Sequence, residues 1–498
     1  MKHFVRACVL FLAVVLPTAA SAAPPGVTSR PPPNVLFIAV DDLRPALGCY
    51  GDAAAISPRI DSLAARGTLF ARAYCQQAVC SPSRNTVLTG RRPDTARIYD
   101  LPTNFRTTLP HVVTLPQHFR QAGYHAEAMG KIYHVGHGNH DDPASWSVPS
   151  WNPRGRADGD PPPARPKAGA AAKKPADRAA AKKARGRPFA ARDVADGDLP
   201  DGKIAGHAVE RLGALKAAGK PFFLAVGFHK PHLPFVAPKK YWDLHDPAKL
   251  PAGAPAGLPD GAPAYVGNGS GELRRYAGVP DKGPVPADLA RTLVQGYYAC
   301  VSYTDAQVGR VLDALDPLGL RDNTIVVLWG DHGFQLNDHG LFAKHTNFEQ
   351  AVRVPLIVAA PGRGAGGARS DALVELADLY PTLAELAGLK APAGVEGTSF
   401  VPLLDDPRRP WKTAAFSQWP KAIPGVGGDG MGYSVRTARY RLTEWTVPDT
   451  TYRALELYDY ETDPHESRNV AKDPGYAKVA GEMSAVLKKG WRGALPVK

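Results

Sequence analysis

Three uninterrupted apolar runs, each followed at once by polar residues, constrain the fold of this 498-residue chain more than any other feature. The runs are VLFIAV, PFFLAVG and TIVVLW, at residues 35–40, 221–227 and 324–329. Short apolar runs rich in β-branched and aromatic residues are typical of central strands in a sheet that is covered on both faces. Because ligands of open α/β sheets bind beyond the carboxyl ends of the strands, the polar residues that follow each run are candidate site residues.

The residues that follow the first and third runs have the chemistry of metal ligands. Asp41 and Asp42 follow the first run, and Asp331 and His332 follow the third. Adjacent carboxylates repel each other, and hard oxygen ligands of this kind suit Ca²⁺ or Mg²⁺. An Asx turn that begins the next loop is the alternative explanation for the Asp-Asp pair. The second run leads to His229, again at the carboxyl end of a predicted strand.

The remaining patterns predict an α/β fold, with a large mixed, mostly parallel sheet flanked by helices. Helices are expected at residues 57–67, 202–220 and 293–315, and further strands at residues 68–74 and 355–360. Towards the C-terminus, short alternating stretches predict a small antiparallel sheet at residues 433–437, 440–444 and 456–459, followed by a helix near residues 476–491. We therefore predict a main domain at residues 34–410 and a smaller α+β subdomain at residues 411–498.

The first 22 residues have the pattern of a secretory signal. Lys2 and Arg6 precede an apolar run at residues 7–16, and Ala20-Ser21-Ala22 matches a small-residue cleavage site. The apolar run is too short to cross a membrane, and no later run of about 20 apolar residues follows. We expect an exported protein, periplasmic or secreted and soluble, without stable membrane association.

Most of the formal charge of +13 lies in the segment at residues 153–192, whose 12 Lys or Arg outnumber its 3 Asp by 9. The segment has few large apolar residues, so we expect a disordered or partly helical insert. Basic runs attract nucleic acid, but the predicted export and the lack of interleaved aromatic residues argue against a nucleic-acid partner. Weak attraction to an anionic polysaccharide stays open.

The stretch at residues 80–84, Cys-Ser-Pro-Ser-Arg, contains the candidate nucleophile. Taken alone, it also fits a small buried thiol at a turn set by Pro82, with Arg84 in solvent. A helix is expected to begin at Ser83, and its positive N-terminal end would favour an ionised oxygen on residue 80.

Further stretches accompany this one along the chain. They are VDDLRP at residues 40–45, QQAVCSPSR at 76–84, LTGRRPDT at 88–95, GKIYH at 130–134, the second apolar run with the polar residues after it at 222–234, and DHG at 331–333. Together they resemble the type I sulfatases of the alkaline phosphatase superfamily, and are most similar to the iduronate-2-sulfatase group. The resemblance covers about residues 34–470, interrupted by the basic insert, and several motifs in the expected order are stronger evidence than one alone.

The resemblance implies a sulfuric ester hydrolase with an alkaline phosphatase-like fold, whose catalytic domain would be residues 34–410. In that family a formylglycine-generating enzyme oxidises the residue that matches Cys80 to Cα-formylglycine, whose aldehyde hydrate is the nucleophile. One Ca²⁺ would be held by Asp41, Asp42, Asp331, His332 and residue 80. His332 is the least usual of these ligands, because Ca²⁺ prefers oxygen.

The resemblance also implies roles for three cations. Arg84 would hold residue 80 and stabilise its anionic form, while Lys131 and Lys344 would bind the sulfate oxygens. A sulfate ester already carries negative charge, so cations must screen it from an anionic nucleophile and stabilise the transition state.

Two histidines and two further residues complete the implied site. His229 is the candidate general acid for the leaving sugar oxygen, and His134 is the candidate base that allows sulfate to leave. Arg44 and Phe334 are the candidate substrate contacts, with Arg44 directed at a substrate carboxylate. The roles of three more histidines stay open: His232, His339 and His345.

Two other functions stay open. A phosphatase or phosphonate monoester hydrolase of the same superfamily would share the fold but typically uses Thr or Ser in place of Cys80. A non-catalytic protein that binds sulfated polysaccharide would have lost Cys80, Arg84 or a metal carboxylate. A sulfated sugar or glycan is the expected substrate, and similarity favours a uronate, with an aryl or choline sulfate still open. Sequence does not assign disulfide partners to Cys49, Cys75 and Cys300.

Overall fold

The computed structural model describes Met1 and residues 31–153, 181–182 and 185–496. The predicted signal segment, apart from Met1, and most of the predicted basic insert therefore lie outside the described residues. Residues 32–498 form one compact unit.

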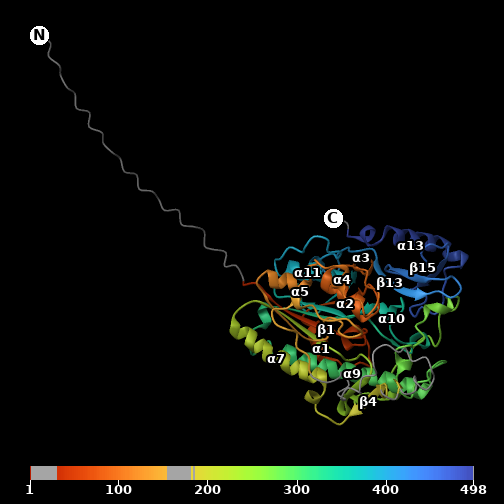
Figure 1. Ribbon diagram of the computed structural model, residues 1–498, viewed down its shortest axis with the longest axis horizontal. Helices are drawn as coiled ribbons and strands as arrows, with labels where there is room; N and C mark the ends of the chain where they lie inside the picture. Colours follow the sequence, from red (N-terminus) through yellow and green to blue (C-terminus); the bar gives the residue numbers. More distant parts are fainter. Residues whose placement is uncertain (2–30, 154–180, 183–184, 497–498) are drawn as a thin grey trace. The chain divides into compact units, whose positions relative to one another are not determined.

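An eight-stranded sheet forms the centre of the unit (Figure 1). Its strands lie in the order β10-β2-β11-β7-β1-β5-β3, and β12 pairs with β2. The strand bounds are β1 Asn34–Val40, β2 Thr68–Tyr74, β3 His125–Gly130, β5 Phe222–Phe228, β7 Thr324–Gly330, β10 Arg353–Val354, β11 Leu356–Ala359 and β12 Ala368–Glu375. The three apolar runs are thus the adjacent strands β5, β1 and β7, as their composition predicts.

The sheet is mixed but mostly parallel, which confirms the predicted fold class. The strands β3, β5, β1 and β7 are parallel to one another. β11 is antiparallel to both β7 and β2, so that β2 again runs in the direction of β7. The carboxyl ends of β1, β2, β3, β5 and β7 therefore lie at one edge of the sheet.

Helices cover both faces of this sheet, and the side chains of β1 alternate between two cores. Leu36, Ile38 and Val40 pack into the core with α1, α7 and α9, whereas Phe37 and Ala39 pack into the core with α2, α5 and α11. Figure 1 shows α7 and α9 below β1, and α2, α5 and α11 above it. Each buried large apolar side chain contributes about 1.5–3 kcal/mol, which is why these runs need to be apolar throughout.

The helix bounds agree closely with the predicted helices. The helices are α1 Pro58–Ala64, α2 Cys80–Thr89, α3 Pro93–Ala96, α4 Phe105–Thr108, α5 Leu115–Gln121, α7 Pro200–Ala218, α8 Lys239–Trp242, α9 Ala287–Asp313, α10 Glu349–Val352, α11 Leu379–Leu386, α12 Val401–Asp405 and α13 Ala477–Lys489. Among the described residues, none of these helices combines the length and apolarity that a membrane crossing requires.

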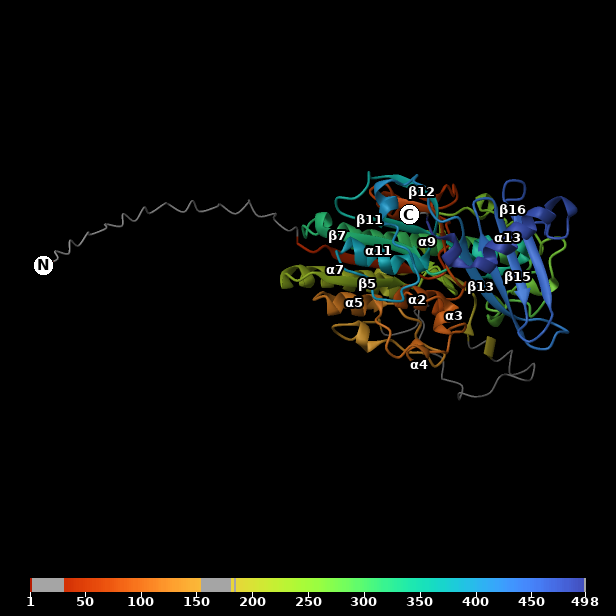
Figure 2. The same ribbon diagram turned by 90° about the horizontal axis from the view of Figure 1, so that it is seen from above.

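A four-stranded antiparallel sheet with α13 on one face forms the C-terminal part (Figure 2). Its strands are β13 Ala415–Ala422, β14 Asp429–Arg436, β15 Tyr440–Thr446 and β16 Arg453–Asp459. The predicted sheet is confirmed, and β13 is a strand that the sequence analysis did not predict. The boundary near residue 410 stays a prediction.

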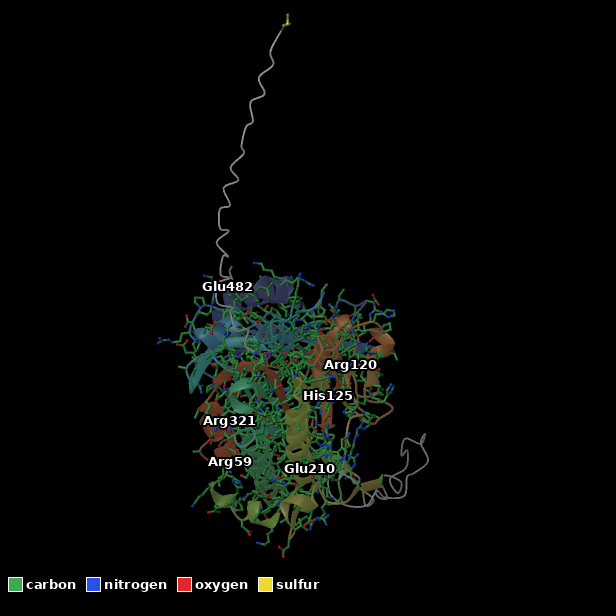
Figure 3. All side chains as sticks on the ribbon, turned by 90° about the vertical axis from the view of Figure 1, so that its left-hand side faces the viewer. Arg59, Arg120, His125, Glu210, Arg321 and Glu482 are labelled. Atoms are coloured by element: carbon green, nitrogen blue, oxygen red, sulfur yellow. The ribbon has the colours of Figure 1, made fainter. Side chains whose placement is uncertain are left out.

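One short strand falls inside the predicted basic insert. Residues Phe189–Arg192 form β4, which pairs in parallel with β6 at Phe235–Pro238. The end of that segment is therefore part of the fold, because the backbone of β6 satisfies its hydrogen bonds. The remaining short strands are β8 Gln335–Leu336 and β9 Phe342–Ala343. Figure 3 looks onto the amino-terminal edge of the large sheet, where His125 begins β3 and Arg321 precedes β7.

Candidate active site

The ends of β1 and β7 bring two predicted ligand pairs together. Val40 lies beside Gly330 in the parallel register, so Asp41 and Asp42 leave the sheet next to Asp331. The backbone N–H of Asp42 donates to Asp331 Oδ1 at 3.0 Å. Asp42 adopts a φ of 61°, a left-handed conformation that is uncommon outside glycine and typical of functional sites.

Cys80 enters the same site from the carboxyl end of β2, as the first residue of α2. Its Sγ lies 3.5 Å from Asp41 Oδ1 and 3.4 Å from both His332 Nε2 and Lys131 Nζ. The helix begins at Cys80, three residues before the predicted start, because Pro82 is tolerated in a first turn where no N–H donor is needed. Burial raises the pKa of the Cys80 thiol well above its usual value, and the Asp41 carboxylate adds to the rise.

Arg84, one turn further along α2, is fully buried and ties the two strand ends together. Its Nε donates to Asp331 Oδ2 at 2.8 Å and its Nη2 donates to Asp41 Oδ1 at 3.1 Å. The third nitrogen donates to the carbonyl oxygens of Lys131 and Ile132. Although burial opposes it, Asp331 and Asp41 raise the pKa of Arg84, so the guanidinium is charged.

Two glycines determine where Lys131 lies. A Cβ on Gly130 would stand 2.0 Å from the carbonyl oxygen of Gly227, and a Cβ on Gly227 would stand 2.2 Å from that of Lys131. Only glycine allows the ends of β3 and β5 to approach this closely. The Lys131 ammonium consequently reaches the Asp41 carboxylate and the Cys80 thiol.

Lys344 supplies the second cation, from the loop after β9. Its Nζ lies 3.0 Å from both carboxylate oxygens of Asp42 and 2.9 Å from Glu272 Oε2. The other Glu272 oxygen lies 3.2 Å from His232 Nε2. Burial opposes the shift, but Lys344 and His232 hold the pKa of Glu272 well below its usual range.

The two predicted acid–base histidines, His134 and His229, both border the cavity that Lys131 lines. His134 Nε2 lies 3.1 Å from His137 Nδ1, and the two rings stack at a centroid distance of 5.3 Å. Burial and the nearby Lys131 charge lower the pKa of His134 to about 3. The same two causes lower the pKa of His229 to about 3.

The four residues Asp41, Asp42, Cys80 and His332 each offer a ligand atom, and these atoms lie within 4.8 Å of one another. Two carboxylates, an imidazole and the side chain of residue 80 make a donor set that fits one divalent cation. The Asp331 carboxylate adjoins them, with Oδ2 3.5 Å from His332 Nε2, and is held by Arg84.

Two adjoining cavities open onto this cluster, with volumes of about 340 and 480 Å³. These volumes lie in the range of small-molecule sites. Cys80 and Lys344 line the first cavity, and Asp41, Lys131 and His229 line the second. Both are lined by His134, His137, His232, Arg185 and Tyr276. A further cavity of about 380 Å³ beside the small sheet contains none of the predicted site residues.

The structure does not bring the two predicted substrate contacts into these cavities. Phe334 is 0% exposed and packs against Phe235 and Tyr297. Arg44 forms an ion pair of 2.6 Å with Asp338 and lines neither cavity. Neither side chain lines either of these cavities, and the two substrate contacts stay predictions.

Several cavity residues were missed or left open by the sequence analysis. Glu272 and His137 lie in turns, and Arg275 ends the 3-10 helix Leu273–Arg275; none of the three lies in a stretch with strand or helix periodicity in the sequence. His232 and His345 line the first cavity, whereas His339 stacks on Phe348 at 4.1 Å and is a core residue. The described cysteines, including Cys49, Cys75 and Cys300, form no disulfide with one another.

Comparison with known proteins adds independent findings. A family model described as Sulfatase matches residues 33–389, and one described as N-sulphoglucosamine sulphohydrolase, C-terminal, matches residues 337–492. Iduronate 2-sulfatase of Homo sapiens is 38% identical over 518 aligned residues, which cover 88% of this chain and 91% of the relative. A sulfatase of Formosa agariphila is 32% identical, over 92% of this chain and 86% of its own length.

Solved structures share the fold over nearly the whole chain. One, in complex with its substrate D-glucosamine-2-N,6-O-disulfate, has a TM-score of 0.71 at 21% identity and covers 93% of this chain and 98% of its own. A phosphonate monoester hydrolase from Silicibacter pomeroyi has a TM-score of 0.71 at 24% identity and covers 93% and 96%. At these identities the likeness concerns the fold.

Proposed function

Because the chain belongs to the sulfatase family and is a sulfuric ester hydrolase, we propose that it removes sulfate from a sulfated sugar of the iduronate-2-sulfate type. The proposal includes Cα-formylglycine at residue 80 and one Ca²⁺. The observation that carries it is the position of Cys80, whose Sγ lies within 3.5 Å of a carboxylate, an imidazole and an ammonium group at the end of the sheet. A nucleophile formed on this side chain would attack the sulfur atom of the sulfate ester next to the cationic side chains of the site.

The ligand set proposed for Ca²⁺ is Asp41, Asp42, Asp331, His332 and residue 80. When bound there, the metal would withdraw charge from the sulfate oxygens and lower the pKa of a hydroxyl on residue 80. Asp331 would be the ligand most firmly oriented by the protein, because Arg84 and two backbone N–H groups already hold its carboxylate. Such support is what keeps a metal ligand in position.

Lys131 and Lys344 are proposed to bind the sulfate oxygens. Each ammonium group pairs with a site carboxylate and lines a cavity that a substrate can enter. Binding of the sulfate ester between them would place its charge in a desolvated cluster of cations, where electrostatic stabilisation is strongest. Arg84 is buried behind residue 80 and would act by holding that residue and its neighbours.

His229 and His134 are proposed to move protons. Both are neutral near pH 7 in this structure, because burial and Lys131 lower their pKa values to about 3. A bound sulfate ester would raise the pKa of His229 through its negative charge, so that the imidazolium can protonate the leaving sugar oxygen. The Nδ1 atom of His134 is buried without a hydrogen-bond partner among the described residues, so it is available to accept a proton from residue 80.

Maturation and location complete the proposal. Cys80 is 2% exposed, so a formylglycine-generating enzyme would have to reach it before the chain is folded. We also propose export to the periplasm or the medium, on the pattern of residues 1–22, with a sulfated carbohydrate as the partner and neither nucleic acid nor a membrane.

Mass spectrometry of the peptide that contains Cys80, together with a sulfate-release assay, tests the proposal. Protein made with a formylglycine-generating enzyme should show a mass lower by about 18 Da at residue 80. It should release sulfate from a 2-O-sulfated uronide, and a chelator should abolish this activity until Ca²⁺ is restored. Cys80→Ala, purified in the same way, is the matched control and should lose at least about 1,000-fold in rate.

Two outcomes would contradict the proposal. Full sulfatase activity with an unmodified Cys80 thiol would exclude the formylglycine mechanism. Hydrolysis of a phosphonate monoester, with no sulfate ester hydrolysed, would favour the phosphonate hydrolase alternative.

A further inference from the structure

Two arginines line the catalytic cavity but are not needed by the proposed sulfate chemistry. Arg185 and Arg275 lie in the wall of the cavity that contains Cys80, and Arg185 also borders the cavity that contains Lys131. Within the described residues, neither guanidinium has a carboxylate at ion-pair distance, whereas Lys131 and Lys344 both do. The cavity therefore has cationic groups beyond those that bind the scissile sulfate.

Arg185 is held in place by the segment that it packs on. Its guanidinium stacks over the ring of Tyr276 at 5.1 Å, a cation–π contact with a buried side chain. The next residue, Gly186, accepts a hydrogen bond of 2.8 Å from the backbone N–H of Ala277. On the other side, Lys182 donates to the carbonyl oxygen of Val279 at 2.8 Å. These contacts orient Arg185 in the wall of the cavity.

The two arginines lie near the His134–His137 pair. Burial lowers the pKa of His137, and the charges of Arg275 and Arg185 lower it further. The charge of Lys131 has a smaller effect in the same direction. Arg275 ends the 3-10 helix Leu273–Arg275, one residue before Tyr276, on whose ring the Arg185 guanidinium stacks. Glu272, which also borders the cavity, is already paired with Lys344 and His232.

Arginine is suited to one kind of ligand at such a position. Its planar guanidinium binds carboxylate or sulfate oxygens through two parallel hydrogen bonds, and it stays charged at every physiological pH. We propose that Arg185 and Arg275 form a second anion subsite. The substrate would then be a sulfated sugar with another negative group, a carboxylate or a second sulfate, near the scissile ester. This inference rests on the proposed sulfatase activity and assigns the residues of the same site that would bind the second negative group of the substrate.

The test measures the sulfate released from three substrates: a neutral sugar monosulfate, a uronate monosulfate and a neutral sugar disulfate. Arg185→Ala and Arg275→Ala should each lower kcat/KM about 10- to 100-fold on the substrates with a second anion. On the neutral monosulfate the loss should stay within about threefold, since no charge-assisted bond is lost there. Arg185→Lys should retain part of the discrimination, because it keeps the charge but not the paired geometry.

Arg187→Ala is the matched control, because Arg187 lies two residues along the same segment, stacks over Phe189 at 5.4 Å and lines neither cavity. Its kcat/KM values should match the wild type on all three substrates. A preference for the uronate over the disulfate would identify the second anion as a carboxylate, and the reverse preference would identify a sulfate.

Failure of the subsite and failure of the proposed function give different results. A wild type that hydrolyses all three substrates equally well, or arginine variants that lose activity equally on all three, would overturn the subsite and leave the sulfatase activity standing. A wild type with formylglycine that hydrolyses none of the three, nor a simple aryl sulfate, would overturn the proposed function itself.

Discussion

Arg84 donates hydrogen bonds to four groups around Cys80, and its role follows from its burial. A charge that is fully removed from water is costly unless every donor finds an acceptor. Here the acceptors are the Asp331 and Asp41 carboxylates and the carbonyl oxygens of Lys131 and Ile132. One side chain thereby fixes the ends of β1, β3 and β7 relative to one another. The planar fork of arginine is needed for this, because a lysine has one nitrogen.

We expect Arg84→Lys to lower kcat by about 100-fold or more, since the groups around residue 80 lose their fixed positions. The same change should lower the free energy of unfolding by about 3 kcal/mol, because carboxylates stay buried without a full set of donors. Steady-state kinetics and urea unfolding measure the two effects. Arg91→Lys is the control: Arg91 is partly exposed and donates to the Ala393 carbonyl, so a change within about 0.5 kcal/mol is expected. Equal effects of the two substitutions would contradict this role for Arg84.

At the level of elements, a buried ionic cluster joins the small sheet to the large one. Glu349 at the start of α10 pairs with Arg441 of β15 and lies 3.4 Å from Arg436 of β14. Its other oxygen accepts from the Tyr74 hydroxyl of β2 at 3.0 Å. Although burial opposes it, the two arginines lower the pKa of Glu349 to about 2. Because Tyr74 ends the strand that leads to Cys80, the cluster connects the small sheet to the active-site edge.

Replacement of Arg441 by Met should lower the free energy of unfolding by about 3–5 kcal/mol, because Glu349 and Glu466 would keep buried charge without this partner. Arg453→Met is a matched control on the neighbouring strand β16. Arg453 is 48% exposed and pairs with Glu444, so its loss should cost at most about 1 kcal/mol. Chemical denaturation of both variants, followed by tryptophan fluorescence, measures the difference. A loss for Arg441→Met no larger than that for Arg453→Met would show that the cluster is not needed for stability.

For the whole molecule, one buried carboxyl group predicts a dependence of stability on pH. Glu456 is 2% exposed and accepts hydrogen bonds of 2.6 Å from both Trp445 Nε1 and the Tyr458 hydroxyl. Burial raises its pKa to about 7, from an ordinary value of 4.5. Between these two pH values the folded protein keeps the proton and the unfolded chain releases it. Stability from this group is therefore complete below pH 4.5 and is lost as the pH rises to 7.

Glu456→Gln should remove this dependence, because the amide stays neutral and can still accept from Trp445 and donate to Tyr458. Relative to the wild type, the free energy of unfolding of the variant should increase by about 3 kcal/mol between pH 4.5 and pH 8. Urea denaturation at several pH values measures the difference. Glu461→Gln, at an exposed position, should differ from the wild type by less than about 0.5 kcal/mol throughout. A difference for Glu456→Gln that does not change with pH would refute the prediction.

The sequence alone determined the strands that build the sheet and the residues at their ends. The runs at residues 35–40, 221–227 and 324–329 are apolar because both faces of β1, β5 and β7 are buried, and burial is a local and strong constraint on composition. Parallel strands place their carboxyl ends at one edge. The convergence of Asp41, His229 and Asp331 could therefore be predicted without coordinates.

Only the tertiary structure decided which loop residues join them. Glu272, Arg275 and Arg185 reach the cavity from a loop and short helical turns, whose positions depend on long-range packing and which have no periodic pattern in the sequence. Packing also decides the positions of Arg44 and Phe334, which come shortly after predicted strands. Arg44 pairs with Asp338, and Phe334 is buried against Phe235 and Tyr297. A strand end fixes where a residue leaves the sheet, and side-chain packing then decides whether it faces the cavity or the core.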